Sequence, residues 1–251
     1  MRWPALFLDD GGVLNEITRR RLQWQGLVAR YCAPRLGGAP AAWAAANAEV
    51  AARLGREYEA HFGADAAASW SAYWAGYEED WLGGMCAVLG IAPPPERATR
   101  LRLVRECASY VTRRVRAAVP GAVGAIRRLH AAGYTLHTAS GETSWELDGY
   151  LTGMRVRGCF GALYGPDRVD TAKAGPLFYA RVFAHAAIPP GGVLVVDDSE
   201  RALGWAAEVG ARTVLCRPEP PANPHHLHVR TLAELPRLLE CWTDIQGLRL
   251  A

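Results

Sequence analysis

Short apolar runs recur along the 251-residue chain, separated by longer polar and Gly- or Pro-containing stretches. The runs are ALFL (5–8), YTLHTA (134–139), GVLVVDD (192–198) and ARTVLC (211–216). Runs of this kind are typical of strands buried on both faces of a parallel sheet. Helical spacing of apolar residues lies between the later runs, over 122–131, 175–186 and 199–208. This alternation predicts an α/β fold with a doubly wound parallel, Rossmann-like sheet.

Residues 17–117 break the alternation of strands and helices. They contain no convincing strand, and their helical stretches are rich in Ala and Arg, with turn signals at 37–38, 83–84 and the triple proline 93–95. We therefore predict an all-helical cap domain over 17–117, inserted into an α/β core formed by 1–16 and 118–251.

An aromatic stripe lies within this predicted insert. Trp70, Trp74, Tyr77 and Trp81 are spaced by four, three and four residues, which places them on one face of a helix. We interpret the stripe as the core of the insert, with an aromatic substrate pocket as the alternative.

Charge and cysteine content narrow the range of partners. The formal net charge is only +3, and the basic residues are scattered, so the sequence favours neither nucleic acid nor an anionic membrane as a partner. The basic triplet 19–21 is expected on a solvated helix face. The six cysteines form neither a CxxC pair nor a dense framework, which favours a reduced protein without zinc. With no signal-peptide pattern and no apolar run of about 18 residues, we expect a cytoplasmic protein.

Polar residues follow three of the predicted strands. The strands end in Asp9-Asp10, in TASG (138–141) and in Asp197-Asp198-Ser199. The carboxyl ends of strands form the ligand crevice of an open α/β sheet, so these groups are expected in one site. Carboxylates brought together there repel unless a cation joins them, and an all-oxygen site suits Mg²⁺. Free N–H groups and a hydroxyl can hold an anion beside it.

These residues resemble the motifs of the haloacid dehalogenase superfamily of hydrolases. The first motif of that family runs from an apolar strand through Asp, any residue, Asp, Gly, Thr or Val, and Leu, so counting back from GVL (12–14) identifies Asp9 as its first aspartate. Thr138 resembles the hydroxyl of the second motif, Lys173 the lysine of the third, and VVDDS (195–199) the acidic fourth motif. The helical insert resembles the mobile cap of the family.

The resemblance implies a role for each matching residue. The implied catalytic residues are Asp9 as nucleophile, Thr138 and Lys173. The implied phosphate-binding groups are Gly11, Gly12, Thr138, the N–H of Ala139 and Lys173. The implied Mg²⁺ ligands are Asp9, the carbonyl of Gly11, and Asp198 with Asp197 supporting it. The substrate implied is a small phosphorylated molecule that reacts through an aspartyl phosphate.

Lys173 has support from composition as well. It is the only lysine among 28 basic residues, in a chain that otherwise uses arginine. A compact ammonium in place of the planar guanidinium is expected where only the ammonium fits.

Gly11 departs from the family pattern, because the phosphatases carry a second aspartate there as general acid and base. Loss of such a group costs on the order of 10² to 10⁴ in rate. Shifting the nucleophile to Asp10 places the GVL segment one residue too close, so Asp10 is expected to cap the turn instead. Glu16, Glu57 and His61 are candidate substitutes for the acid, although surface or structural roles are favoured for each.

The sequence is compatible with three functions. The first is a Mg²⁺-dependent phosphatase of low or atypical activity, and the second is a phosphate-binding or regulatory protein with impaired turnover. The third is a 2-haloacid dehalogenase, which also lacks the second aspartate but needs no Mg²⁺, leaving the acidic pair at 197–198 without a purpose. A phosphonoacetaldehyde hydrolase is excluded because the predicted cap contains no lysine. Glu142 and Trp145 are possible substrate contacts, with capping and packing roles favoured, and the oligomeric state is open.

Overall fold

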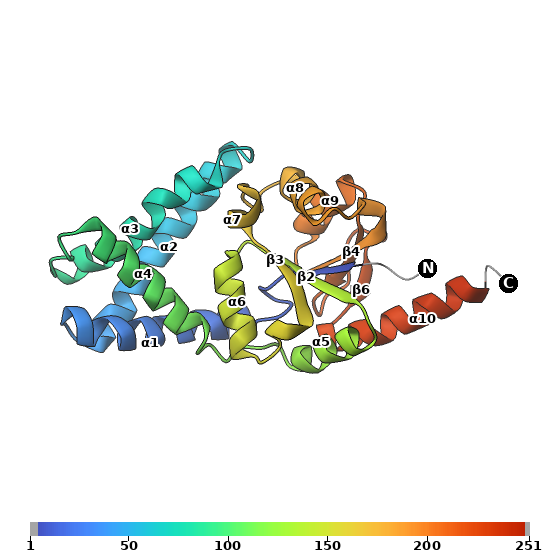
Figure 1. Ribbon diagram of the computed structural model, residues 1–251, viewed down its shortest axis with the longest axis horizontal. Coiled ribbons are helices and arrows are strands. Elements are labelled where there is room, and N and C mark those ends of the chain that lie inside the picture. Colours follow the sequence, from blue (N-terminus) through green and yellow to red (C-terminus); the bar gives the residue numbers. More distant parts are fainter. Residues whose placement is uncertain (1–4, 249–251) are drawn as a thin grey trace.

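A six-stranded parallel sheet forms the centre of the protein in the computed structural model, which describes residues 5–248 (Figure 1). The strands are β1 (Ala5–Leu8), β2 (Thr135–Ala139), β3 (Phe160–Tyr164), β4 (Val193–Asp197), β5 (Arg212–Cys216) and β6 (Leu227–Val229). Their order is β3-β2-β1-β4-β5-β6, and all five pairings are parallel. The predicted doubly wound α/β fold is confirmed. The four predicted strands are present, and β3 and β6 were missed.

Helices cover both faces of the sheet because strand residues alternate between the faces. Leu6 and Leu8 of β1 pack into one apolar cluster with α5 (Ala122–Ala131), α6 (Ser144–Gly153) and α10 (Leu235–Leu248). Ala5 and Phe7 pack into another cluster with α8 (Pro176–Ala186) and α9 (Glu200–Glu208). Figure 1 shows α5 and α10 below the sheet and α8 and α9 above it. Every residue of β1 and β4 is buried.

The helices of this core are α5 (Ala122–Ala131), α6 (Ser144–Gly153), α7 (Pro166–Val169), α8 (Pro176–Ala186), α9 (Glu200–Glu208) and α10 (Leu235–Leu248). Short 3-10 helices are η1 (Arg157–Cys159), η2 (Pro190–Gly192) and η3 (Leu232–Glu234). The helices predicted over 122–131, 175–186 and 199–208 are confirmed as α5, α8 and α9. Ser199 caps α9 by accepting a hydrogen bond from the Ala202 N–H at 3.3 Å.

Four long helices make up the inserted part, which we call the cap: α1 (Ile17–Leu36), α2 (Pro40–Ala64), α3 (Trp70–Leu89) and α4 (Arg97–Thr112). They lie together to one side of the sheet (Figure 1) and bury their own core, which includes Trp43, Leu54 and Met85. The chain segments that enter and leave the cap pair with each other, through Glu16 N to Ala117 O at 2.8 Å. This pairing anchors the cap beside the end of β1.

Helix α6 forms the surface of the core on which the cap rests. Tyr150 of α6 belongs to the hydrophobic core of the cap, and α4 packs directly on α6. A Cβ at Gly149 would lie 2.0 Å from Thr112 Oγ1, so only glycine permits this approach of the two helices. The cap therefore covers the end of the sheet where β2 leads into α6.

Candidate active site

Three carboxylates meet at the carboxyl ends of the two central strands. Asp9 follows β1, and Asp197 and Asp198 end and follow β4. The strands are held side by side by the Asp9 N–H, which donates to Val196 O at 2.9 Å. Within the described residues these three are the group suited to hold a metal ion, with one oxygen from each lying within 4.8 Å of the others. The strand order reverses between β1 and β4, so the group occupies the switch point where α/β sheets bind ligands.

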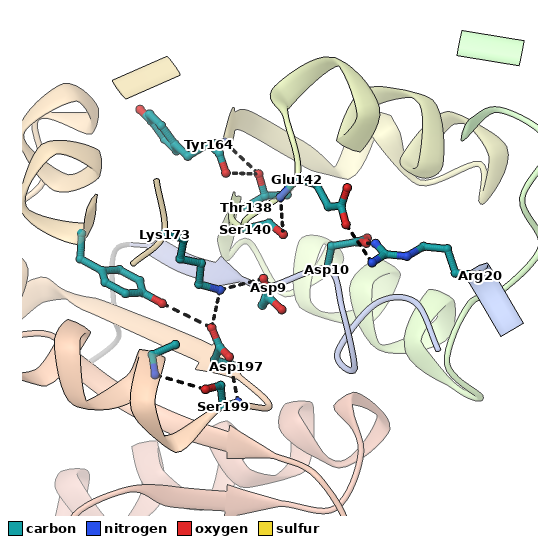
Figure 2. Close-up of polar contacts among 12 residues, drawn as sticks. Asp9, Asp10, Arg20, Thr138, Ser140, Glu142, Tyr164, Lys173, Asp197 and Ser199 are labelled. Carbon is teal, nitrogen blue, oxygen red and sulfur yellow. Dashed lines mark hydrogen bonds and ion pairs between the residues drawn. The ribbon is translucent and has the colours of Figure 1, made fainter. Parts of the chain in front are cut away.

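Lys173 joins two of these carboxylates (Figure 2). Its ammonium donates to Asp9 Oδ1 at 2.8 Å and to Asp197 Oδ2 at 2.6 Å, with only 10% of the side chain exposed. Tyr179 of α8 donates its hydroxyl to Asp197 Oδ2 at 3.3 Å. The lone lysine of the sequence thus lies at the centre of the site, as the motif predicted, and Tyr179 is a contact that sequence reasoning missed.

Burial and mutual repulsion raise the pKa values of two of these carboxyl groups. Burial, together with the charges of Asp9 and Asp197, raises the pKa of Asp198 to about 6. Burial also raises the pKa of Asp197. Burial alone would lower the pKa of Lys173, but the charges of Asp197 and Asp9 outweigh it and hold that pKa well above its usual value. Within the described residues only Lys173 forms ion pairs with these three acidic groups, while Arg20 and Arg201 line the pocket farther along its wall.

Solved structures of similar shape identify this arrangement of sheet and cap. A HAD-hydrolase from Bacillus subtilis, YfnB, bound to magnesium, matches 96% of this chain and 100% of its own, at a TM-score of 0.65 and 14% identity. The defluorinating L-2-haloacid dehalogenase Rha0230 matches 96% of this chain and 99% of its own, at a TM-score of 0.64 and 18% identity. The chain has the haloacid dehalogenase fold.

The sequence itself is distant from these proteins. The L-2-haloacid dehalogenase from Xanthobacter autotrophicus, solved with chloropropionic acid covalently bound, matches 96% of this chain and 99% of its own at a TM-score of 0.58 but only 15% identity. No protein-family model and no curated protein matches the sequence. The haloacid dehalogenase fold is therefore shared in shape, whereas the reaction depends on the residues of the site.

The donor set suits a divalent cation that prefers oxygen ligands, such as Mg²⁺. Three carboxylates supply hard oxygen ligands, and Lys173 is the one residue in the described part of the chain that forms ion pairs with them, so a divalent cation can balance the remaining negative charge. Asp9 and Asp198 would hold the ion. Gly11 lines the same pocket, which is compatible with the predicted ligand role of its carbonyl.

Gly12 keeps the turn after β1 tight against the acidic pair. Its φ is +73°, and a Cβ there would lie 2.1 Å from Asp198 Oδ2. The Gly12 N–H donates to Asn15 O at 2.8 Å within the turn. The Gly12 N–H is thus engaged within the turn, and the lack of a side chain allows Asp198 to approach. The phosphate-binding role of Gly12 stays a prediction.

The second motif of the haloacid dehalogenase fold is displaced from its predicted position. Thr138 is fully buried, and its hydroxyl accepts from the Tyr164 N–H at 2.8 Å on the neighbouring strand β3. Ala139 is also fully buried and packs in the apolar cluster under α8. Ser140 and Gly141 line the acidic pocket in their place. The residues of this motif that line the pocket therefore lie two positions later than predicted, because Thr138 and Ala139 still belong to strand β2.

Asp10 and Arg20 form a buried ion pair to one side of Asp9 (Figure 2), and Arg20 also lines the acidic pocket. Asp10 accepts from Asn15 Nδ2 at 2.7 Å, so its predicted role in the turn is confirmed. Arg20 also contacts Glu142 Oε1 at 2.8 Å, with only 15% of its side chain exposed. The expectation that all of residues 19–21 are solvated was wrong for Arg20, which joins the cap helix α1 to the loops after β1 and β2.

None of the three predicted substitutes for the missing acid lines the acidic pocket. Glu16 caps α1 by accepting from the Thr18 and Arg19 N–H groups, and Glu57 pairs with Arg53 on an exposed face of α2. His61 packs edge-on against the ring of Phe62 and tilted against the ring of Tyr73 in the cap, with centroids 4.8 Å apart in both pairs. Their structural roles, which the sequence favoured, are the ones observed.

Two cavities meet at the loop after β2. The acidic pocket has a volume of about 220 Å³, and its lining includes Asp9, Lys173 and Asp198. A second cavity, of about 250 Å³, lies between the cap and α6. Gly141 and Glu142 line both of them. Trp74, Tyr77 and Trp81 line the second cavity, so the aromatic stripe serves a pocket as well as the cap core.

No helix within residues 5–248 is both long and apolar enough to cross a membrane.

Proposed function

We propose that the protein is a Mg²⁺-dependent phosphate monoester hydrolase acting on a small phosphorylated molecule. The observation that carries this proposal is the group of three carboxylates around a single ammonium at the switch point of the sheet. Displacement of halide needs no cation, whereas transfer of a phosphoryl group needs positive charge close to the nucleophile. The acidic pair Asp197-Asp198 has a purpose only in the second reaction.

In this proposal Asp9 attacks phosphorus, the bond to the alcohol oxygen breaks, and water then hydrolyses the aspartyl phosphate. Lys173 orients Asp9 through the 2.8 Å contact and offsets the charge of the phosphoryl oxygens. Ser140 and Gly141 line the pocket, where a hydroxyl and backbone N–H groups can bind those oxygens. Mg²⁺ bound by the carboxylates would reduce the repulsion between Asp9 and the phosphate.

The proposal is tested by hydrolysis of p-nitrophenyl phosphate. We expect turnover with Mg²⁺ and its loss with EDTA, because the carboxylates then repel the substrate dianion. Phosphate stabilising the Mg²⁺-loaded protein without any turnover of the ester would favour a binding or regulatory protein instead.

A dehalogenase is the second candidate, since Gly11 lacks the carboxylate of the phosphatases and two of the structures named above are L-2-haloacid dehalogenases. Release of chloride from 2-chloropropionate in the presence of EDTA distinguishes it. Chloride release without phosphatase activity would overturn the proposed function.

Gly11 provides a separate prediction about the missing acid. A Cβ at this position would lie 3.6 Å from Ile17 Cγ1 and 3.8 Å from Asp9 Oδ2, so a side chain fits beside the nucleophile. Gly11→Asp is expected to accelerate hydrolysis of an alkyl phosphate by roughly 10²-fold, because a poor leaving group needs a proton donor. Hydrolysis of p-nitrophenyl phosphate, whose leaving group needs little protonation, is expected to change much less.

Gly11→Asn is the matched control, because it has the same size but cannot transfer the proton. The measurement is the ratio of kcat/KM for the two substrates in each variant. An equal gain in both variants, or none in either, would contradict a missing proton donor at Gly11.

A further inference from the structure

The cavity between the cap and α6 is walled mainly by aromatic rings. They come from three cap helices and the start of α6: Trp24, Tyr58, Trp74, Tyr77, Trp81 and Trp145. Trp74 and Tyr77 stack with ring centroids 4.3 Å apart and an interplanar angle of 13°. Because the cavity shares Gly141 and Glu142 with the acidic pocket, the leaving group of an ester bound at Asp9 is directed toward these rings.

Two of the indoles offer the cavity ring surface instead of a hydrogen-bond donor. The Trp24 indole N–H donates to Tyr150 Oη at 2.6 Å, and the Trp81 indole N–H donates to Asn47 Oδ1 at 2.9 Å. Both polar groups are therefore already satisfied within the protein. A ligand that binds through these two residues meets the rings and their negative π faces.

The polar residues of the cavity are acidic. Glu78, Glu142 and Glu146 line it, and no Lys, Arg or His is among the described residues of its wall. Glu78 pairs with Arg105 through two hydrogen bonds of 3.2 and 3.1 Å, and Glu142 pairs at 2.8 Å with Arg20, which it shares with Asp10.

Glu146 differs from the other two carboxyl groups. It accepts hydrogen bonds from the N–H and hydroxyl of Thr143 at 3.1 and 2.7 Å, and it forms no ion pair with any residue in the described part of the chain. Burial and the charge of Glu142 raise the pKa of Glu146 to about 8. A cation in the cavity would favour the ionised form and complete the charge balance of this wall.

We propose that this cavity binds an alkylated ammonium group carried by the leaving group of the substrate. Aromatic faces attract such cations, and a quaternary ammonium has no N–H groups that would require acceptors from an aromatic wall. Glu146 adds the counter-charge on one side. The inference deepens the proposed function and rests on it, since the group must be joined to a phosphate held at Asp9.

The test compares two esters of the same shape. Phosphocholine carries a trimethylammonium group, and 3,3-dimethylbutyl phosphate carries the uncharged tert-butyl group in its place. We expect kcat/KM to be roughly tenfold higher for phosphocholine, as cation–π contacts in a desolvated site provide. Equal or faster hydrolysis of 3,3-dimethylbutyl phosphate would overturn the inference and leave the phosphatase proposal intact, with a neutral apolar group as the occupant.

A binding measurement tests the cation site without requiring that the ester is hydrolysed. Isothermal titration of the unmodified protein with choline and with 3,3-dimethylbutanol should show tighter binding of choline. If neither ester is hydrolysed but choline binds more tightly, the phosphatase proposal fails and the cation site stands. If choline binds no more tightly than the alcohol, the cation site is refuted.

Glu146→Gln removes the charge while keeping the capping box that Glu146 forms with Thr143, because glutamine makes the same contact. The preference for phosphocholine over 3,3-dimethylbutyl phosphate should fall by about fivefold. Glu59→Gln, on an exposed face of α2, is the matched control and should keep the preference of the unmodified protein. An unchanged preference in Glu146→Gln would contradict the role assigned to this carboxylate.

Discussion

Asp9→Asn should reduce hydrolysis of p-nitrophenyl phosphate by roughly 10⁴-fold or more, as removal of an enzymatic nucleophile does. Asparagine has the same shape as aspartate, so Lys173 keeps a hydrogen-bond acceptor near the position where it now lies 2.8 Å from Asp9 Oδ1. What is lost is the anionic oxygen that forms the bond to phosphorus. The measurement is kcat with saturating Mg²⁺, together with far-UV circular dichroism to show that the fold is retained.

Asp10→Asn is the matched control for this experiment. Asp10 is fully buried and points to Asn15 and Arg20, away from the acidic pocket. Its replacement should lower stability, because Arg20 loses a charged partner, but the folded fraction should still turn over. Activity that survives Asp9→Asn, or that disappears with a well-folded Asp10→Asn protein, would contradict the assignment of the nucleophile.

Lys173→Met should affect both activity and stability. The ammonium is the positive charge between Asp9 and Asp197, and removal of one partner from a buried ion pair costs about 3–5 kcal/mol. Loss of a charge that faces the phosphoryl oxygens should also lower kcat by roughly 10²- to 10³-fold. Urea unfolding measures the change in the free energy of unfolding, and p-nitrophenyl phosphate hydrolysis measures the change in kcat.

A divalent cation makes this second prediction more specific. Without the ammonium the three carboxylates repel more strongly, so Mg²⁺ should raise the Tm of Lys173→Met by more than it raises the Tm of the unmodified protein. Lys173→Arg keeps the charge but not the compact shape, and should recover stability better than activity. A Lys173→Met protein as stable as the original and insensitive to Mg²⁺ would show that the carboxylates are not a cation site.

The main elements of the fold were predictable because they are locally encoded. β1 and β4 are uninterrupted apolar runs, which reflects burial on both sheet faces, and α9 begins at a capping serine. β3 and β6 were missed because a glycine interrupts the apolar run of FGALY and LHV has only three residues, so neither has a distinctive pattern. Their strand character comes from pairing with β2 and β5.

The site was predictable where strand order decides it and not where packing does. Asp9, Asp197 and Lys173 meet as expected, because parallel strands bring their carboxyl ends to one edge of the sheet. Thr138 was misassigned because the residue that faces the pocket depends on how far β2 continues beside β3. Arg20 could not be distinguished from Arg19 and Arg21, because the sequence of a helix does not specify which distant residues pack against each of its faces.

The sequence by itself determined the alternation of strands and helices, the helical insert, and the acidic and lysine motifs, because each depends on residues close together in the chain. The tertiary structure decided the rest. It placed Ser140 and Gly141 in the pocket instead of Thr138, buried Arg20 against Asp10, and converted part of an aromatic stripe into a cavity wall beside the acidic site. These features depend on contacts between distant segments, and only the packing of cap against core specifies which side chains meet.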